Sequence, residues 1–177
     1  YGVSKIGDEW APDQLKALKK EIEDAGLHLE AIENFSPADW YDILLDGPRK
    51  KQQMENLKQI IKNVGKAGIP VFGYNFSIAG VWGHDRRFAA RGGADTACFD
   101  REDGGEEYPI PNGEVWNMTY DPHAPAGFLQ PVSQEELWER WTYFINEITP
   151  VAEEYGVRMA AHPDDPPMPR LRGHARL

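Results

Sequence analysis

The stretch "MAAHPDDPPMPR" places a histidine directly before a proline and two aspartates between prolines, after a short apolar run. Proline fixes φ and lacks a backbone donor, so this stretch can continue neither a strand nor a helix and should form a stiff loop. Stiff polar loops that follow a buried strand are common places for chemistry. Because a neutral imidazole is a good ligand for a divalent transition metal, we take His162 as a candidate metal ligand. The alternative is a histidine with a structural hydrogen bond.

Asp164 and Asp165 follow this histidine closely. A carboxylate in this position could orient the imidazole or contact a substrate. The alternative is that both aspartates cap turns, as aspartates in loops often do. We keep both as candidate substrate contacts.

Three helical patterns run along the chain, and each is followed at once by a short apolar run. The helical patterns cover residues 11–26, 49–68 and 133–156, and the apolar runs cover Leu27–Ile32, Ile69–Phe76 and Val157–His162. Ser133 and Glu136 have the spacing of a capping box at the start of the third helix. The repeated order of helix and buried strand is typical of an α/β protein with a parallel sheet, in which ligands bind beyond the carboxyl ends of the strands.

Strand alternation predicts which polar side chains could meet at that end. If one face of each strand points into a barrel, Glu30, Asn75 and His162 approach one central site from three strands. Polar groups inside a barrel must be paired, so they imply a metal or a substrate. Asn75 would then bind a substrate hydroxyl, or it caps the loop that follows. Glu30 is a ligand, a substrate contact, or the partner of an arginine or lysine on a neighbouring strand.

Residues 77–132 form a long connection rich in glycine, proline and aromatic residues. Connections of this length are uncommon in a compact domain and are usually lids or binding loops. Arg86 and Arg87 could clamp a carboxylate, although exposed arginines are common. Trp82 and Trp116 could form an apolar wall of the lid, or they pack the insertion.

The composition excludes several classes of function. The 177 residues are enough for one domain over 1–177, and the formal net charge of −10 argues against a nucleic-acid partner. No apolar run is long enough to span a membrane, the start has no secretory signal, and a lone Cys98 fits a reducing cytoplasm. Glycine-rich nucleotide-binding and serine-hydrolase motifs are absent from the sequence. Because the chain starts at Tyr1 and stops without a closing element, we expect a fragment.

Several of these stretches resemble the D-mannonate dehydratase family. "AAHPDDPPMPRLRG" resembles the family signature, in which an apolar strand ends in H-P-D-D-P-P. "NLKQIIKNVGKAGIPVFGYNF" is similar to the family's helix and strand ending in Y-N-F, and "LEAIENF" resembles the preceding strand, with Glu30 at the family's strand glutamate. The family continues Y-N-F into an aspartate–tryptophan–threonine–arginine segment, whereas "SIAGVWGHDRR" offers only Trp82 and Arg86 or Arg87 as equivalents.

The resemblance implies a xylose-isomerase-like TIM (β/α)8 barrel, of which this chain covers about three βα units and a long loop insertion. It also implies a divalent metal, manganese or iron(II), with His162 as one ligand. The family's other ligands, a cysteine, further histidines and an aspartate, have no counterpart in this sequence. The implied reaction removes water from a sugar acid, D-mannonate, to give 2-keto-3-deoxy-D-gluconate.

Two alternatives stay open beside this reaction. The protein could be a sugar isomerase or epimerase on the same barrel, or a non-catalytic sugar-binding relative. A homo-oligomer is also an open question, and this segment alone should be inactive because it holds a single ligand.

Overall fold

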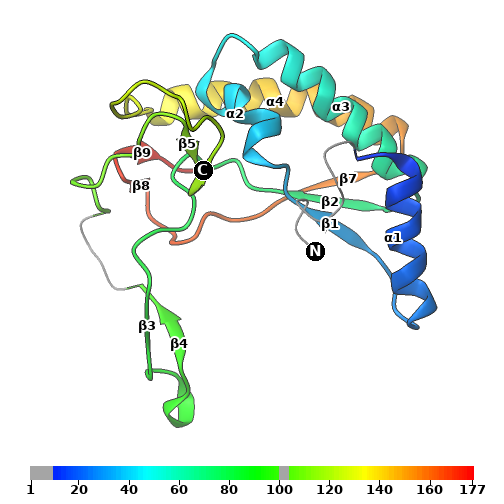
Figure 1. Cartoon of the computed structure of the whole chain (residues 1–177), viewed down its shortest axis with the longest axis horizontal. Coiled ribbons are helices and arrows are strands. Elements are labelled where there is room, and N and C mark those ends of the chain that lie inside the picture. Colours follow the sequence, from blue (N-terminus) through cyan, green and yellow to red (C-terminus); the bar gives the residue numbers. More distant parts are fainter. Residues whose placement is uncertain (1–9, 100–103) are drawn as a thin grey trace. The chain divides into compact units, whose positions relative to one another are not determined.

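The computed structural model describes residues 10–99 and 104–177, which divide into two units (Figure 1). Unit 1 contains the described residues up to Phe76 and the segment Trp138–His162. Unit 2 contains Ser77–Leu137 and Pro163–Leu177. The sequence-based prediction of one domain with a lid over residues 77–132 stays a prediction.

Unit 1 is built on a three-stranded parallel sheet in the order β1-β2-β7. The strands are β1 (Ala31–Glu33), β2 (Val71–Tyr74) and β7 (Arg158–Ala161), and the helices are α1 (Pro12–Asp24), α2 (Pro37–Leu45), α3 (Lys50–Lys66) and α4 (Gln134–Glu154), the last of which begins in unit 2. The predicted α/β organisation with a parallel sheet is confirmed. Each strand is shorter than the apolar run that predicted it.

Local sequence explains where the helices begin and end. At the start of α4 the backbone N–H of Ser133 donates to Glu136 at 2.8 Å, and the N–H of Glu136 donates to the Ser133 hydroxyl at 3.2 Å, so the predicted capping box is confirmed. Gly68 has φ +74° just after α3 and ends that helix. Helix α2 was not predicted, although Pro37 in its first turn and the apolar spacing after it are helix signals.

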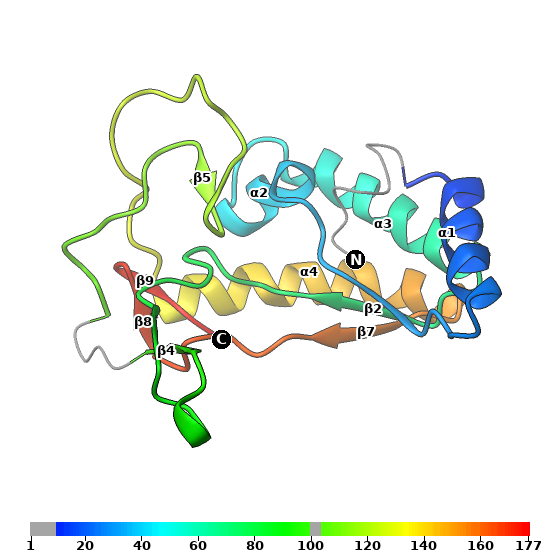
Figure 2. The same cartoon turned by 60° about the horizontal axis from the view of Figure 1, so that its bottom comes forward.

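The helices lie on one side of the sheet (Figure 2). Ile32, Phe72 and Tyr74 are buried on that side, and Ile32 is paired with Phe72 in the register of β1 and β2. The next pair along, Glu33 and Gly73, points to the other side because side chains alternate along a strand. Within unit 1 the sheet therefore has a packed face and an open face.

The packed face is held by an aromatic cluster around Phe144 of α4, which is fully buried. The ring of Phe144 lies 5.0 Å from that of Tyr74, 5.5 Å from Trp40 and 5.6 Å from Phe76, measured between centroids. Burial raises the pKa of Tyr74, whose hydroxyl accepts a hydrogen bond from Trp141 Nε1 at 3.3 Å. Three segments distant in sequence are thus joined by the side chain of Phe144.

Apart from the first residues of α4, unit 2 consists mainly of short antiparallel hairpins and loops. The hairpins are β3 (Asp85–Arg87) with β4 (Thr96–Cys98), β5 (Glu114–Val115) with β6 (Met118–Thr119), and β8 (Arg170–Leu171) with β9 (His174–Ala175); the 3-10 turn η2 (Arg91–Gly93) lies between β3 and β4. The buried apolar side chains of this unit include Ile78, Ile110, Val115 and Leu171.

A buried ion pair closes unit 2. Arg176 Nε lies 3.1 Å from Asp164 Oδ2, and the two side chains are 2% and 9% exposed. Arg176 Nη1 donates to the carbonyl of Gly80 at 3.0 Å, and the N–H of Leu177 donates to Asp164 Oδ2 at 3.3 Å. The proline-rich stretch is therefore tied at Asp164 to the last residues of the chain and, through Arg176, to the start of the 77–132 connection.

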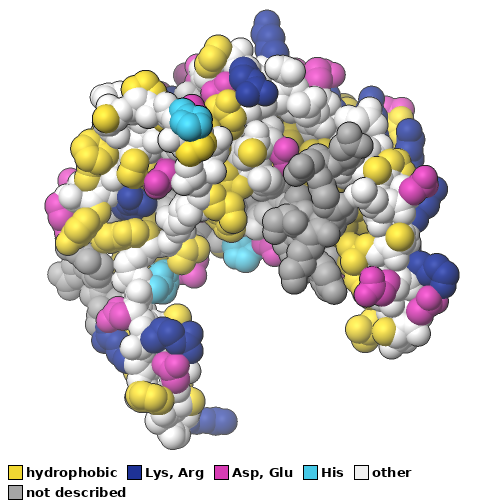
Figure 3. Space-filling model, in the orientation of Figure 1, with side chains coloured by type: hydrophobic (Ala, Val, Ile, Leu, Met, Phe, Trp, Pro, Cys, Tyr) yellow, Lys and Arg dark blue, Asp and Glu magenta, His cyan; other side chains and the backbone are white. Residues whose placement is uncertain are grey.

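Charges of both signs are mixed on the surface of the hairpin β3–β4, where basic side chains lie next to acidic ones (Figure 3). None of the helices in the described part of the chain is both long enough and apolar enough to cross a membrane.

We predict that Phe144→Ala lowers the free energy of unfolding by about 3–5 kcal/mol, because it opens a cavity among the rings of Trp40, Tyr74 and Phe76. Denaturant unfolding followed by tryptophan fluorescence measures the change. Tyr155→Ala, which removes a partly exposed aromatic residue outside this cluster, is the matched control. A loss below about 1 kcal/mol for Phe144→Ala would show that the cluster does not hold the sheet.

We predict that Arg176→Met destabilises unit 2 by about 3–5 kcal/mol, because it leaves the Asp164 carboxylate buried without its partner. Hydrogen exchange of the Ala175 amide, which donates to Val132, reports opening of this unit. Arg91→Met, an exposed arginine, is the control. The double variant Arg176→Met, Asp164→Asn should recover part of the loss, and equal protection in all four proteins would contradict this role of the pair.

Candidate functional site

The candidate site lies at the carboxyl ends of the strands of unit 1, on the open face of the sheet. The backbone N–H of His162 donates to the Tyr74 carbonyl at 2.8 Å, which extends the pairing of β2 and β7 to this residue. His162 Nδ1 lies 2.8 Å from Glu33 Oε1. Both side chains are about half exposed, at 54% for His162 and 49% for Glu33. An imidazole and a carboxylate thus meet at the sheet edge where parallel folds bind ligands.

Glu33 reaches His162 by crossing β2, which separates their strands. It crosses at Gly73, with which it is paired in the register. A Cβ atom at Gly73 would lie 3.0 Å from Cγ and 3.4 Å from Cβ of Glu33. The lack of a side chain at this position is therefore what gives the glutamate its path.

The predicted face of the first strand was wrong by one residue. If Glu30 faced the site, strand alternation would turn Ile32 to the same face, but Ile32 is buried against the helices and the strand begins only at Ala31. Glu33, which sequence reasoning missed, is the glutamate beside His162. The available signal in the sequence was Ile32 with a glutamate directly after it. An apolar strand residue faces the core, so the residue that follows it faces the opposite side of the sheet.

Glu30 instead lies 3.5 Å from Arg158 of β7, with both side chains well exposed. This is the alternative in which Glu30 pairs with an arginine on a neighbouring strand.

Asn75 lies at the end of β2 and is partly buried. Its Nδ2 donates to Asn34 Oδ1 at 2.9 Å, and the N–H of Asn34 donates to the Gly73 carbonyl at 2.8 Å. Asn34 adopts φ +70°, a conformation that asparagine tolerates better than most residues. The two amides therefore fix the loops that leave β1 and β2, and Asn34 directly follows Glu33 in sequence.

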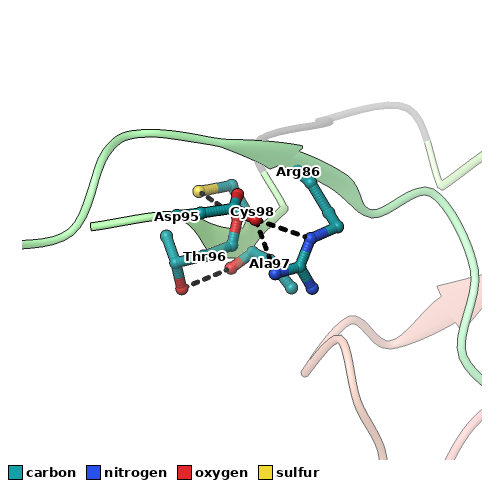
Figure 4. Close-up of polar contacts among 5 residues, drawn as sticks. All are labelled: Arg86, Asp95, Thr96, Ala97 and Cys98. Carbon is teal, nitrogen blue, oxygen red and sulfur yellow. Dashed lines mark hydrogen bonds and ion pairs between the residues drawn. The ribbon is translucent and has the colours of Figure 1, made fainter. Parts of the chain in front are cut away.

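In unit 2, Arg86 is held within its own hairpin (Figure 4). Its Nε and Nη2 donate to Asp95 Oδ2 at 3.0 and 2.7 Å. Cys98, on the strand paired with that of Arg86, places its thiol 3.9 Å from the Thr96 carbonyl. Since 70% of the Arg86 side chain is exposed, part of the guanidinium stays open to solvent.

Trp82 packs within unit 2, which corresponds to the alternative in which this residue packs the insertion. Its ring lies 5.3 Å from that of Tyr108. It also covers Gly105 so closely that a Cβ there would clash with the indole ring. Trp116 donates its backbone N–H to the Ile78 carbonyl at 2.8 Å.

The two aspartates of the proline-rich stretch differ in environment. Asp164 is buried in the ion pair with Arg176, so its carboxylate is already used by the fold. Asp165 is exposed, and its Oδ1 lies 3.5 Å from Nε2 of His84, which belongs to the same unit. The pairing of Asp164 with a residue twelve positions later gave no signal in the sequence.

The donor groups fit a metal site only in part. Across residues 10–99 and 104–177, no group of three or more histidine, cysteine, aspartate or glutamate side chains is arranged to hold a metal ion. His162, with Nδ1 directed at Glu33 and its side chain half exposed, could offer Nε2 as one ligand. This segment can therefore supply one imidazole to a metal whose other ligands come from elsewhere.

Comparison with known families gives a match over almost the whole chain. The model of the family described as D-mannonate dehydratase (UxuA) matches residues 3–177. The match includes the proline-rich stretch and the strands that carry Glu33, Asn75 and His162.

Individual relatives carry related names. Mannonate dehydratase 2 of Halalkalibacterium halodurans is 34% identical over 175 residues, covering 94% of this chain and 50% of that protein. A mannonate dehydratase of Streptococcus suis is 36% identical and covers 92% of this chain and 46% of that protein. The chain thus spans about half the length of the curated relatives it matches.

A solved structure extends the similarity to the fold. The crystal structure of mannonate dehydratase from Streptococcus suis serotype 2 matches with a TM-score of 0.73 and 36% identity, over 97% of this chain and 45% of that one. Since the family model covers residues 3–177, the chain belongs to the D-mannonate dehydratase family.

Proposed function

We propose that the protein containing this chain is a hydro-lyase that converts D-mannonate to 2-keto-3-deoxy-D-gluconate and water. The observation that carries the proposal is the family match over residues 3–177, with an imidazole at the carboxyl end of β7 inside the matched segment. Because the chain spans about half of its relatives, the activity is proposed for the longer protein.

We propose that the three parallel strands are part of a TIM barrel. Three strands cannot close a barrel, and the open face of the sheet is where the interior of a barrel would lie. The polar side chains on this face, Glu33 and His162, fit a barrel whose active site lies at the carboxyl ends of its strands.

In this proposal His162 binds a divalent cation, manganese or iron(II), through Nε2. Imidazole nitrogen is a suitable donor for both ions. The cation would supply Lewis-acid stabilisation of the negative charge that develops next to the substrate carboxylate. Two contacts within this chain would orient the site. Glu33 faces Nδ1 of His162, and Asn75 and Asn34 fix the adjoining loops.

The remaining candidate substrate contacts differ in how strongly the fold already engages their side chains. Arg86 and Asp165 have exposed side chains that could meet a sugar acid in the longer protein. Glu30 is exposed but paired with Arg158, and Trp82 is packed on Tyr108. Asp164 is the weakest candidate because its carboxylate is buried against Arg176.

We predict that His162→Ala in the full-length protein removes most of the bound metal and lowers turnover of D-mannonate by more than about 100-fold. The loss should exceed that of an outer-shell partner, since a direct ligand is removed. Metal content by elemental analysis and formation of a 2-keto acid measure the two effects. His28→Ala, an exposed histidine of unit 1 outside the site, is the control.

Unchanged metal content in His162→Ala would remove His162 from the metal site. Turnover of a ketose without any dehydration of D-mannonate would contradict the hydro-lyase assignment.

We predict that Arg86→Ala raises KM for D-mannonate about 10-fold with little change in kcat, because Arg86 would bind the substrate carboxylate without taking part in the reaction. Steady-state kinetics of the full-length protein measure both constants. Asp95→Ala frees Arg86 from its hairpin partner and is the matched control, in which KM should not rise. If both variants change KM equally, Arg86 acts by shaping the hairpin.

A further inference from the structure

Glu33 and His162 come from strands separated by β2, yet their side chains meet at 2.8 Å. We infer that Glu33 is a positioning residue for metal binding: it accepts the Nδ1–H of His162 and so leaves Nε2 unprotonated and directed at the cation. This inference rests on the proposed role of His162 as a metal ligand.

The chemistry of the pair fixes which nitrogen carries the proton. A neutral imidazole has one N–H, and the hydrogen bond made by one nitrogen decides the state of the other. An ionised carboxylate can only accept, so the nitrogen that faces Glu33 must be the donor. Nε2 then keeps its lone pair, and the ring is held in one orientation. Because of both properties, His162 should bind a metal more tightly than a freely rotating histidine would.

Gly73 is the structural condition for this contact. Neighbouring strands lie about 4.8 Å apart, so the side chains of Glu33 and His162 together span about twice that distance across β2. The glutamate passes over Gly73, where a Cβ would lie 3.0 Å from its Cγ. Ala160, paired with Gly73 on the β7 side, is also small. A glycine weakens a strand but often marks a close approach, and here the group that approaches is the Glu33 side chain.

A purely structural ion pair makes a different prediction. Glu33 and His162 are each about half exposed, and exposed pairs contribute little to stability. Removing Glu33 should therefore leave folding unchanged, so a loss of metal affinity in that variant reports on the imidazole itself.

The test is Mn²⁺ binding to the full-length protein, measured as free Mn²⁺ by electron paramagnetic resonance. Glu33→Ala should raise the dissociation constant about 10–100-fold, the usual effect of losing an outer-shell partner. Glu33→Gln should cost less because its amide oxygen still accepts from Nδ1–H. Gly73→Val should resemble Glu33→Ala, since a side chain there blocks the path of the glutamate. Glu55→Ala, an exposed glutamate on α3 paired with Lys58, is the control and should bind Mn²⁺ unchanged.

Nitrogen-15 spectra of labelled histidine in the metal-free protein provide a second readout. The wild type should show His162 protonated at Nδ1, and Glu33→Ala should show a mixture of both tautomers. An Nε2–H tautomer in the wild type would overturn the inference, as would wild-type Mn²⁺ affinity in both Glu33→Ala and Gly73→Val.

His162→Ala separates this inference from the proposed function. If His162→Ala loses Mn²⁺ while Glu33→Ala binds it normally, only the role of Glu33 fails. If His162→Ala itself binds Mn²⁺ normally, the proposed metal site and the inference fail together.

Discussion

The packing of helices against one face of the β1-β2-β7 sheet is the constraint on which the rest of unit 1 depends. Phe144 of α4 fills the centre of that face and contacts aromatic rings from the β1–α2 region and from β2. Because side chains alternate along a strand, burying Ile32 and Phe72 forces Glu33 and Gly73 to the other face. The core thus determines which polar groups are available for chemistry.

The parallel register then brings those groups to one edge. The strands run in the same direction, so residues at their carboxyl ends are neighbours in space even when they are distant in sequence. Glu33 and His162 are 2.8 Å apart although more than a hundred residues separate them in the chain, and Asn34 and Asn75 are joined in the same way. A glycine between the first two makes the contact sterically possible. The candidate site therefore depends on the register of the strands and on a glycine, which has no side chain, at position 73.

Helices and strands that depend on local sequence patterns were predicted correctly. Contacts that depend on residues distant in the chain were not. Helical periodicity and the capping box located α1, α3 and α4 to within a few residues, and the alternation of helix and strand predicted the parallel sheet. The bounds of the first strand were predicted wrongly, because the apolar run has six residues whereas the strand begins only at Ala31. That error exchanged Glu33 for Glu30. The partners of Arg86 and Asp164 were not predictable, since hairpin and loop pairing in unit 2 follows no periodic pattern.

The most direct test of the account is an anomalous difference map from crystals of the full-length protein loaded with Mn²⁺. We predict a peak within coordination distance of Nε2 of His162, with Nδ1 of the same ring directed at Glu33. A peak bound through Nδ1, or one distant from this ring, would contradict the account.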